Sequence, residues 1–375
     1  MKSKTVLCVI GTRPEAIKMA PVVAALKHHH PHLKSRVLLS GQHIPMLHQS
    51  LTGFNISIDR DLAVMRENQS LAGLTARLFD AFDPVLAEEA PDLVVAQGDT
   101  TTVMVTATAA FYRGIPFAHV EAGLRTGNLR YPFPEEFNRS VVGRLASLNF
   151  APTETAKNAL LAEGADPSTI HVTGNTVIDA LLETGSRVSA PALPIPDGKR
   201  VILLTIHRRE NFGRPMKRVL KAVREIAHIF ADVVFIFPVH PNPNVRQCVY
   251  SVLGRHPSFL LTEPLTYSEL VSILKRATIV LTDSGGLQEE APALGKPVLV
   301  LRTETERPEA VAAGVAKLVG TRTNQVVQAV SMLLSDSTEY SAMARGVSPF
   351  GDGYAAQRIS AIIRRFLSSD AVRQK

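Results

Sequence analysis

The chain has 375 residues, of which 45% are hydrophobic and 20% are charged, and its formal net charge at pH 7 is +7. This length allows two domains with separate cores, and the composition is that of a soluble globular protein. It excludes a membrane-spanning segment, because no apolar run is long enough, and it disfavours nucleic-acid binding, because the basic residues form neither a block nor an aromatic-interleaved stripe.

The cysteines and the N-terminus indicate the compartment. Cys8 falls in an apolar strand and Cys248 in a helical stretch, so the sequence predicts no disulfide and a reducing environment. The N-terminus runs directly into a strand instead of a signal peptide. We therefore expect a cytoplasmic enzyme or binding protein.

The first predicted unit is a strand followed by a helix. The unbroken apolar run of Thr5–Ile10 predicts a buried parallel strand, and residues 14–28 predict a helix. Thr12 and Glu15 have the spacing of a capping box at the start of that helix.

Basic residues lie at both ends of this helix. Arg13 and Lys18 follow a strand end, where open α/β sheets bind ligands, although solvated surface charges are the alternative. The contiguous run His28–His30, with His32, lacks the spacing of a metal-ligand set. We expect a solvated helix end there and no metal site.

The first half continues as alternating strands and helices. Strands are predicted at Val37–Ser40, Asp92–Ala96, Pro116–Val120 and Ile170–Thr173, and helices at Ser70–Ala90, Val103–Tyr112 and Asn175–Glu183. In the first of these helices, Leu71, Leu74, Leu78 and Phe82 form one apolar stripe, which predicts a core-facing side.

Three carboxylates follow these strands. Asp99 and Glu121 each come just after a strand, and Glu135 opens a helix after a loop rich in glycine and proline. An N-cap role is the alternative for Asp99. Together the three resemble acid–base machinery more than random surface residues.

The second half repeats the architecture after a proline-containing linker candidate, Ser186–Gly198. Each of its predicted strands is followed by a polar cluster; the strands are Val201–Thr205, Val233–Phe237, Ile279–Leu281 and Val298–Leu301. Residues 355–367 predict a final helix with an apolar stripe, and this helix could cross back onto the first domain.

The most informative stretch is Ile279–Val300. Its strand turns through Ser284-Gly285-Gly286 into a helix, and glycines at a helix N-terminus let an anion such as phosphate approach the bare backbone N–H groups. Glu289 and Glu290, one turn later, suit sugar hydroxyls. The alternative is a buried helix with Ser284 as a simple N-cap.

The sequence therefore predicts an α/β protein with two Rossmann-like, doubly wound parallel-sheet domains facing across a cleft. The expected boundaries are 1–175 for the first domain, which carries the carboxylates, 176–353 for the second, and 354–375 for the C-terminal helix.

The residues expected at this cleft favour one kind of ligand. A cationic set suits a diphosphate, and the carboxylates opposite it imply a nucleotide-linked sugar. No G-x-G-x-x-G follows a strand and no Walker A motif is present, so we expect neither nicotinamide nor ATP to take part. The cationic set is Arg13, Lys18, His207, Arg208, Arg209 and Arg307.

At these residues the chain resembles the bacterial non-hydrolysing UDP-N-acetylglucosamine 2-epimerases, essentially from end to end. Any one shared motif is weak, whereas eight in this order are specific. They are GTRPEAIKMAP (11–21), GDTTT (98–102), HVEAGLRTG (119–127), TGNTVIDAL (173–181), HRREN (207–211), PVHPNPNV (238–245), LTDSGGLQEEAP (281–292) and TERPEAV (305–311).

The resemblance implies a GT-B type fold and the interconversion of UDP-N-acetylglucosamine and UDP-N-acetylmannosamine without a cofactor or a metal, in a homodimer. It implies catalytic roles for Asp99, Glu121, Glu135 and His207. It assigns substrate binding to Arg13, Lys18, Ser284, Gly285, Gly286, Glu290, Arg307 and Leu270, with Leu265 also matching a position that contacts uridine.

The resemblance also implies a second, activating substrate site at Gln42, Glu136, Arg209 and His240. Here the chain departs from the family pattern: Ile44-Pro45 follows Gln42-His43, Tyr131-Pro132 replaces a Ser-Pro dipeptide, and Asn68 stands where arginine is frequent. We therefore expect substrate activation to be weak or absent.

Three other functions fit parts of the pattern. A GT-B glycosyltransferase shares the fold and the diphosphate site but does not need three carboxylates. A hydrolysing epimerase would release free UDP and N-acetylmannosamine. A nucleotide-sugar sensor would bind without turnover, which the intact carboxylates argue against.

Overall fold

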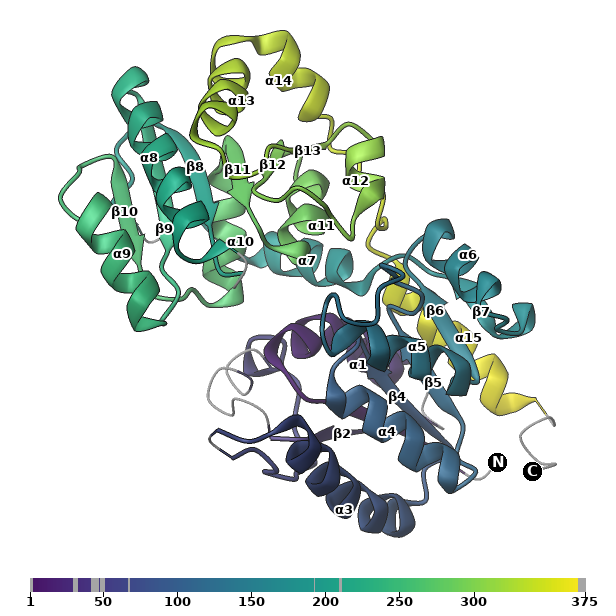
Figure 1. The fold of residues 1–375 in the computed structure, drawn as a ribbon. Coiled ribbons are helices and arrows are strands. Elements are labelled where there is room, and N and C mark those ends of the chain that lie inside the picture. Colours follow the sequence, from purple (N-terminus) through teal and green to yellow (C-terminus); the bar gives the residue numbers. More distant parts are fainter. Residues whose placement is uncertain are drawn as a thin grey trace. The chain divides into compact units, whose positions relative to one another are not determined.

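The computed structural model describes residues 3–29, 33–41, 47, 51–66, 68–191, 193–208 and 211–369. The chain divides into two compact units, of which the first comprises Met1–Ala180 with Phe350–Lys375 and the second Leu181–Pro349 (Figure 1). The sequence places these boundaries at 175/176 and 353/354. The cleft expected between the units stays a prediction.

Each unit is built on one parallel sheet. The first has seven strands in the order β3-β2-β1-β4-β5-β6-β7, and the second has six in the order β10-β9-β8-β11-β12-β13. The strands of the first are β1 (Lys4–Ile10), β2 (Leu33–Leu39), β3 (Arg60–Asp61), β4 (Leu93–Gln97), β5 (Phe117–Val120), β6 (Leu148–Ala151) and β7 (Ile170–Val172). Those of the second are β8 (Arg200–Thr205), β9 (Val233–Pro238), β10 (Phe259–Thr262), β11 (Ile279–Thr282), β12 (Val298–Val300) and β13 (Ala316–Leu318).

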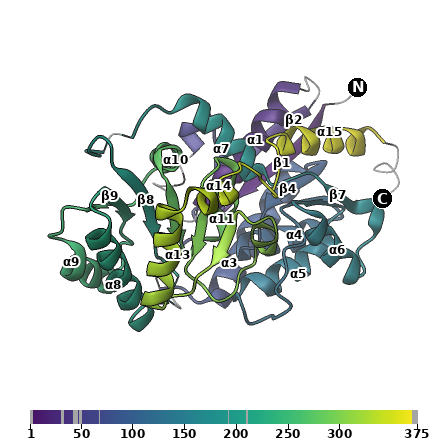
Figure 2. The same cartoon turned by 90° about the horizontal axis from the view of Figure 1, so that it is seen from above.

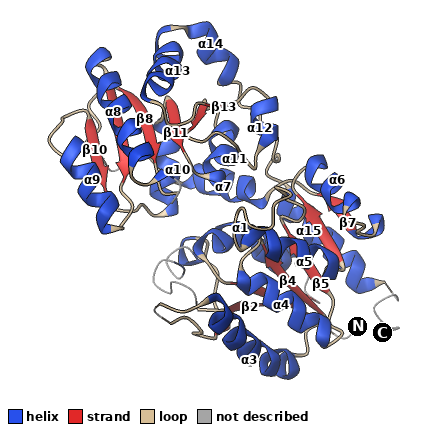
Figure 3. Ribbon diagram, viewed as in Figure 1, coloured by secondary structure: helices blue, strands red, loops and turns tan. Residues whose placement is uncertain are grey.

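Helices cover both faces of each sheet, as Figure 3 shows. The first unit contains α1 (Arg13–His29), α3 (Leu71–Glu89), α4 (Thr101–Tyr112), α5 (Glu135–Leu145), α6 (Glu154–Ala162) and α15 (Ala355–Ser368), and α7 (Thr176–Arg187) begins in it. The second contains α8 (Arg214–Ile229), α9 (Pro243–Leu253), α10 (Tyr267–Arg276), α11 (Gly285–Ala293), α12 (Pro308–Ala312), α13 (Thr323–Ser335) and α14 (Ser337–Met343). These two doubly wound sheets confirm the predicted fold class.

The alternation of side chains along β1 explains why its sequence is apolar throughout. Val6, Cys8 and Ile10 pack into one cluster with α1 and α15, whereas Leu7 and Val9 pack into another with α3 and α4. Because successive side chains of a strand point to opposite faces, a central parallel strand must be apolar at every position.

The final helix completes the first unit. In both Figure 1 and Figure 2, α15 lies along α1, and Ile359 and Ile363 are fully buried in the cluster that they share. Asp179 of α7 accepts hydrogen bonds from the backbone N–H groups of Ala355 and Ala356 at distances of 3.3 and 2.8 Å. This carboxylate supplies partners that the start of α15 would otherwise lack.

Several details differ from the sequence predictions. The strand expected at Val37–Ser40 begins at Leu33, and β3, β6, β10 and β13 were not expected. Leu71, expected in the apolar stripe of α3, is 42% exposed because it is the first residue of the helix, whereas Leu74, Leu78 and Phe82 are buried. The linker candidate 186–198 lies inside the second unit, because the division after Ala180 falls within α7.

Among the described residues, no helix is both long and apolar enough to cross a membrane.

Candidate active site

The carboxylate of Glu121 lies just after β5 and is held by donors from three directions. Lys18 Nζ lies 2.5 Å from its Oε1, Asn175 Nδ2 donates to the same oxygen at 2.9 Å, and Gln97 donates to Oε2. The residue has a φ of 64°, a left-handed conformation that is uncommon and costly outside glycine and is often found at functional sites. The side chain is therefore fixed in place.

Asp99 lies just after β4 and is in a different electrostatic environment. Its Oδ2 is 3.2 Å from Nη1 of Arg139, and its side chain is 29% exposed. Partial burial raises the pKa of Asp99 to about 6; Arg139 and Lys18 oppose this rise, while the negative charges of Glu121 and Glu135 add to it. The alternative N-cap role falls to Thr100, whose side chain accepts from Val103 N.

The two glutamates that open α5 are used differently. Glu135 is half-buried and contributes to the raised pKa of Asp99. Glu136 is 2% exposed and accepts hydrogen bonds from the backbone N–H groups of Thr126 and Gly127 at 3.0 and 2.9 Å, and from Arg139 Nε at 2.8 Å. Although burial opposes it, these donors hold the pKa of Glu136 below its usual range. Glu136 therefore positions the arginine that faces Asp99.

The start of α1 carries a further carboxyl group that the sequence assigns only to capping. Glu15 Oε2 accepts from the backbone N–H groups of Gly11 and Thr12 at 2.5 and 3.2 Å, which is the reach-back half of the predicted capping box. Burial raises the pKa of Glu15 to about 7, despite these hydrogen bonds. Arg13 is the first residue of the same helix and is half-buried.

In the second unit, His207 is oriented by a buried aspartate. Asp283 is fully buried, and one of its carboxylate oxygens lies 3.1 Å from His207 Nδ1. It also accepts from the backbone N–H groups of His207 and Arg208 and from Asn211 Nδ2. Although burial opposes it, these donors lower the pKa of Asp283. The carboxylate thus fixes the His207 ring and leaves its Nε2 for a ligand.

An anion-binding arrangement surrounds the N-terminus of α11. A Cβ placed on Gly285 would lie 3.6 Å from Nη2 of Arg208 and 3.7 Å from Nη2 of Arg307, so two guanidinium groups converge there. Arg307 is 7% exposed and is held by ion pairs with Glu289 and Glu306. Guanidinium groups together with free helix N–H groups suit a phosphate group.

A buried glutamate lies beside this arrangement. Glu290 is 5% exposed and accepts a hydrogen bond from Tyr267 Oη at 2.7 Å, and burial raises the pKa of that tyrosine well above its usual value. Leu265 and Leu270 are half-buried on either side of Tyr267 in the sequence.

His240 belongs to the same unit as His207. Partial burial, together with the charge of His207, lowers the pKa of His240, and its Nδ1 accepts from Asn242 N at 3.1 Å.

The structure thus brings the predicted site residues into two groups. Asp99, Glu121, Glu135 and Lys18 gather in the first unit, and His207, Ser284–Gly286, Glu290 and Arg307 in the second. Gln42, Arg209, and the side chains of the histidine run 28–30 and His32 lie outside the described residues. Within the described residues no group of histidine, cysteine, aspartate and glutamate side chains has the arrangement of a metal site.

The sequence missed the residues that support the site, namely Asp283, Arg139, Asn175 and Gln97. The one available signal was that Asp283, Asn175 and Gln97 are polar residues at or next to a strand end or helix start, whereas Arg139 lies one turn inside α5.

A comparison with known families matches residues 25–364 to the family described as UDP-N-acetylglucosamine 2-epimerase. The chain belongs to the UDP-N-acetylglucosamine 2-epimerase family. A member from Escherichia coli strain K12 is 48% identical over 364 residues, which cover 94% of this chain and 96% of that one.

Solved structures of other members have the same fold. A UDP-N-acetylglucosamine 2-epimerase from Neisseria meningitidis, bound to UDP-N-acetylglucosamine, is 44% identical with a TM-score of 0.91, over 96% of this chain and 100% of that one. A Methanocaldococcus jannaschii member, in complex with UDP-N-acetylglucosamine and UDP, is 32% identical with a TM-score of 0.84, over 96% of this chain and 99% of that one.

Proposed function

We propose that the protein reversibly converts UDP-N-acetylglucosamine to UDP-N-acetylmannosamine by inverting carbon 2 of the sugar without hydrolysis. The observation that carries the proposal is the pair of carboxylates at adjacent strand ends: burial raises the pKa of Asp99 to about 6, whereas the carboxylate of Glu121 is held by Lys18 and by hydrogen-bond donors. Two carboxyl groups in different electrostatic environments suit the removal and the return of a proton.

The chemistry of the sugar explains why a nucleotide must leave and return. The hydrogen on C2 is not next to a carbonyl group, so its removal alone would form an unstabilised carbanion. If the C1–O bond to UDP breaks as a base takes the C2 proton, the electrons form a C1–C2 double bond, which gives 2-acetamidoglucal and UDP. A proton then adds to the opposite face of C2, and UDP re-forms the bond to C1.

This route needs a diphosphate site that stabilises the departing charge and also retains the UDP. We assign that role to Arg208, Arg307 and the N-terminus of α11 at Ser284–Gly286, with His207 beside them. The assignment is supported by the two guanidinium groups that converge on Gly285 and by the buried Asp283 that orients His207.

We assign the sugar to the first unit, where Asp99, Glu121 and Glu135 are the proton-transfer and charge-stabilising groups. We do not divide the acid and base roles among them. In the second unit Glu290 would bind the ribose hydroxyls, and Leu265 and Leu270 would contact the uracil.

Incubation with UDP-N-acetylglucosamine in D2O tests the proposal. We expect deuterium at C2 of both nucleotide sugars, measured by NMR and mass spectrometry, with no steady build-up of UDP. Asp99→Asn should lose most of this deuterium incorporation. The control is Asp83→Asn, which removes an exposed carboxylate paired with Arg113 and should keep it. Accumulation of UDP with free N-acetylmannosamine would instead establish the hydrolysing reaction, and recovery of undeuterated substrate would leave a transferase or a sensor.

We also propose a homodimer that works in the cytoplasm and supplies N-acetylmannosamine units for surface polysaccharide. An exposed apolar patch on α3 and α4 supports the dimer: Phe111 and Tyr112 are 60% and 74% exposed, and the Tyr112 ring stacks on Phe79 at 6.4 Å. Light scattering should give twice the chain mass, and Tyr112→Asp should shift the measured mass toward that of the monomer.

The free thiols Cys8 and Cys248 support the cytoplasm, a reducing compartment, as the place where the protein works.

A further inference from the structure

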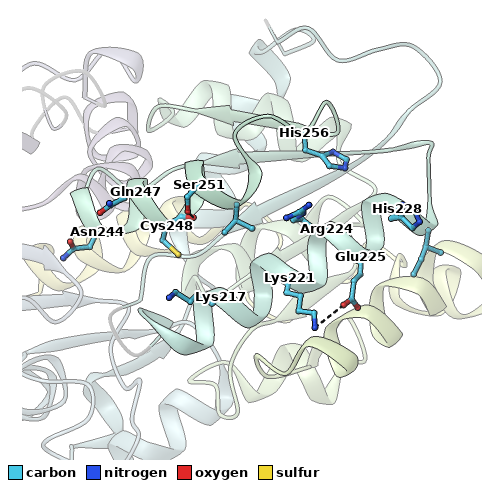
Figure 4. Close-up of a pocket in the computed structure, with 12 residues that line it drawn as sticks. Lys217, Lys221, Arg224, Glu225, His228, Asn244, Gln247, Cys248, Ser251 and His256 are labelled. Atoms are coloured by element: carbon cyan, nitrogen blue, oxygen red, sulfur yellow. Dashed lines mark hydrogen bonds and ion pairs between the residues drawn. The ribbon is translucent and has the colours of Figure 1, made fainter.

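A basic groove runs between α8 and α9 of the second unit, apart from the residues described above. Its volume is about 1040 Å³, at the upper end of the range of ordinary ligand sites (Figure 4). It is lined by Lys217, Lys221, Arg224, Glu225, His228, Ile229, Asn244, Gln247, Cys248, Ser251, Val252 and His256.

Most of the basic side chains of this groove come from one face of α8. Lys217, Lys221, Arg224 and His228 recur every three or four residues, which places them in a row, one per helical turn, at steps of about 5.4 Å. Among the described lining residues, only Glu225 is acidic, and it is 3.9 Å from Lys221. The structure gives Lys217 and Arg224 no ion pair with any described residue. The row therefore offers more positive charge than the protein itself neutralises.

The opposite wall offers neutral hydrogen-bonding groups. Figure 4 shows Asn244, Gln247 and Ser251 on the α9 side of the groove, across from the row on α8. His256 adds a further donor. Its Nδ1 accepts a hydrogen bond from Ser258 N at 3.2 Å, so the neutral ring carries its proton on Nε2, which can donate.

We propose that this groove binds an anion with two or more linked phosphate groups. Cations on successive turns can contact several anionic groups at once, and each phosphate oxygen can accept from an arginine, a lysine or an amide of the facing wall. A single phosphate is too small for the groove. A nucleic acid fits less well, since the described lining has no phenylalanine, tyrosine or tryptophan on which bases could stack.

Cys248 allows this site to be observed without an activity assay. It lines the groove and is half-buried, whereas the other thiol, Cys8, is fully buried in β1. The rate of alkylation of Cys248 by neutral N-ethylmaleimide, followed by mass spectrometry, reports occupancy of the groove. Saturating UDP is present throughout, so that the proposed diphosphate site at α11 is filled.

We expect sodium tripolyphosphate to slow the alkylation of Cys248. Arg224→Gln should raise the half-protecting concentration about tenfold, as expected for the loss of one charge-assisted hydrogen bond. The matched control is Arg218→Gln, which removes another exposed arginine of α8. Arg218 does not line the groove, so its loss should change that concentration less than about twofold.

Three results would overturn the proposal. The first is that tripolyphosphate does not protect Cys248, or that its half-protecting concentration is the same in Arg224→Gln and Arg218→Gln. The second is protection by citrate at the same concentration, which would show a response to any multivalent anion. The third is protection by single-stranded oligothymidylate at lower concentrations than tripolyphosphate, which would make the groove a nucleic-acid site.

Discussion

The ion pair between Lys18 and Glu121 can be tested by removing each partner and then both. The two side chains are 12% and 5% exposed, so each charge depends on the other for much of its stabilisation. In Glu121→Gln the buried ammonium loses its carboxylate, and we expect a loss of about 3 kcal/mol, at the lower end of the cost of breaking a buried pair. In Lys18→Met the carboxylate keeps Gln97 and Asn175 as donors, so we expect about 2 kcal/mol.

The double variant Lys18→Met/Glu121→Gln leaves neither charge unpaired. Its loss should therefore fall short of the sum of the single losses by about 2 kcal/mol. Hydrogen exchange of the segment 117–125, followed by mass spectrometry, measures this local free energy, since about 1.4 kcal/mol corresponds to a tenfold change in the opening equilibrium. The incorporation of deuterium at C2 should fall at least about a hundredfold in all three variants.

Additive losses in the double variant would refute this reasoning, because they would mean that the two charges do not stabilise each other. Full deuterium incorporation in Glu121→Gln would remove the catalytic assignment of Glu121 even if the energetic coupling were present.

Three further predictions concern other residues. Asp99→Asn should lower turnover by about 10² to 10⁴. Because the pKa of Asp99 is raised to about 6 in the folded protein, its ionisation costs stability, so the variant's gain in unfolding free energy should be absent near pH 3, grow between about pH 4 and pH 6 and stay constant above that. A gain that is independent of pH in urea titrations would contradict this. Asp283→Asn should weaken UDP binding about tenfold or more, as measured by calorimetry. The carboxylate of Asp283 accepts hydrogen bonds that orient His207 and Arg208, and an amide has only one accepting oxygen. An unchanged affinity would exclude this positioning role. The initial rate should rise hyperbolically with the concentration of UDP-N-acetylmannosamine, because the sequence departs from the family pattern around the second substrate site. If the curve is sigmoidal instead, and becomes hyperbolic when UDP-N-acetylglucosamine is added, substrate activation is retained.

The order of the elements could be predicted from the sequence because parallel strands buried on both faces are apolar throughout. The runs at β1, β4, β8 and β9 are of this kind, and the predicted bounds of these strands fall within about one residue of those in the structure. The strand predicted at Val37–Ser40 begins at Leu33 in the structure, and the short strands β3, β6, β10 and β13 were not predicted. The exposure of Leu71 could not be predicted, because periodicity assigns a residue to a helix face but does not tell where the neighbouring elements end.

The candidate site could be predicted only as far as local patterns reach. Glycines at a helix start and carboxylates after strands are visible in short windows of sequence, so Gly285 and Asp99 were found. The contacts of Asp283 with His207 and of Asn175 with Glu121 join residues far apart in the chain, and only the folded sheets bring them together.

The position of α15 has a consequence for synthesis of the chain. On the ribosome, residues 1–180 emerge long before Ala355–Ser368, so the apolar surface of α1 that Ile359 and Ile363 later cover stays open to water while the whole second unit is being translated. The second unit is continuous and can fold as soon as it emerges, whereas the first needs the last helix to arrive. A stop codon before Phe350 would therefore leave the earlier-made unit unfinished and prone to aggregate, although it would remove none of the strands of either sheet.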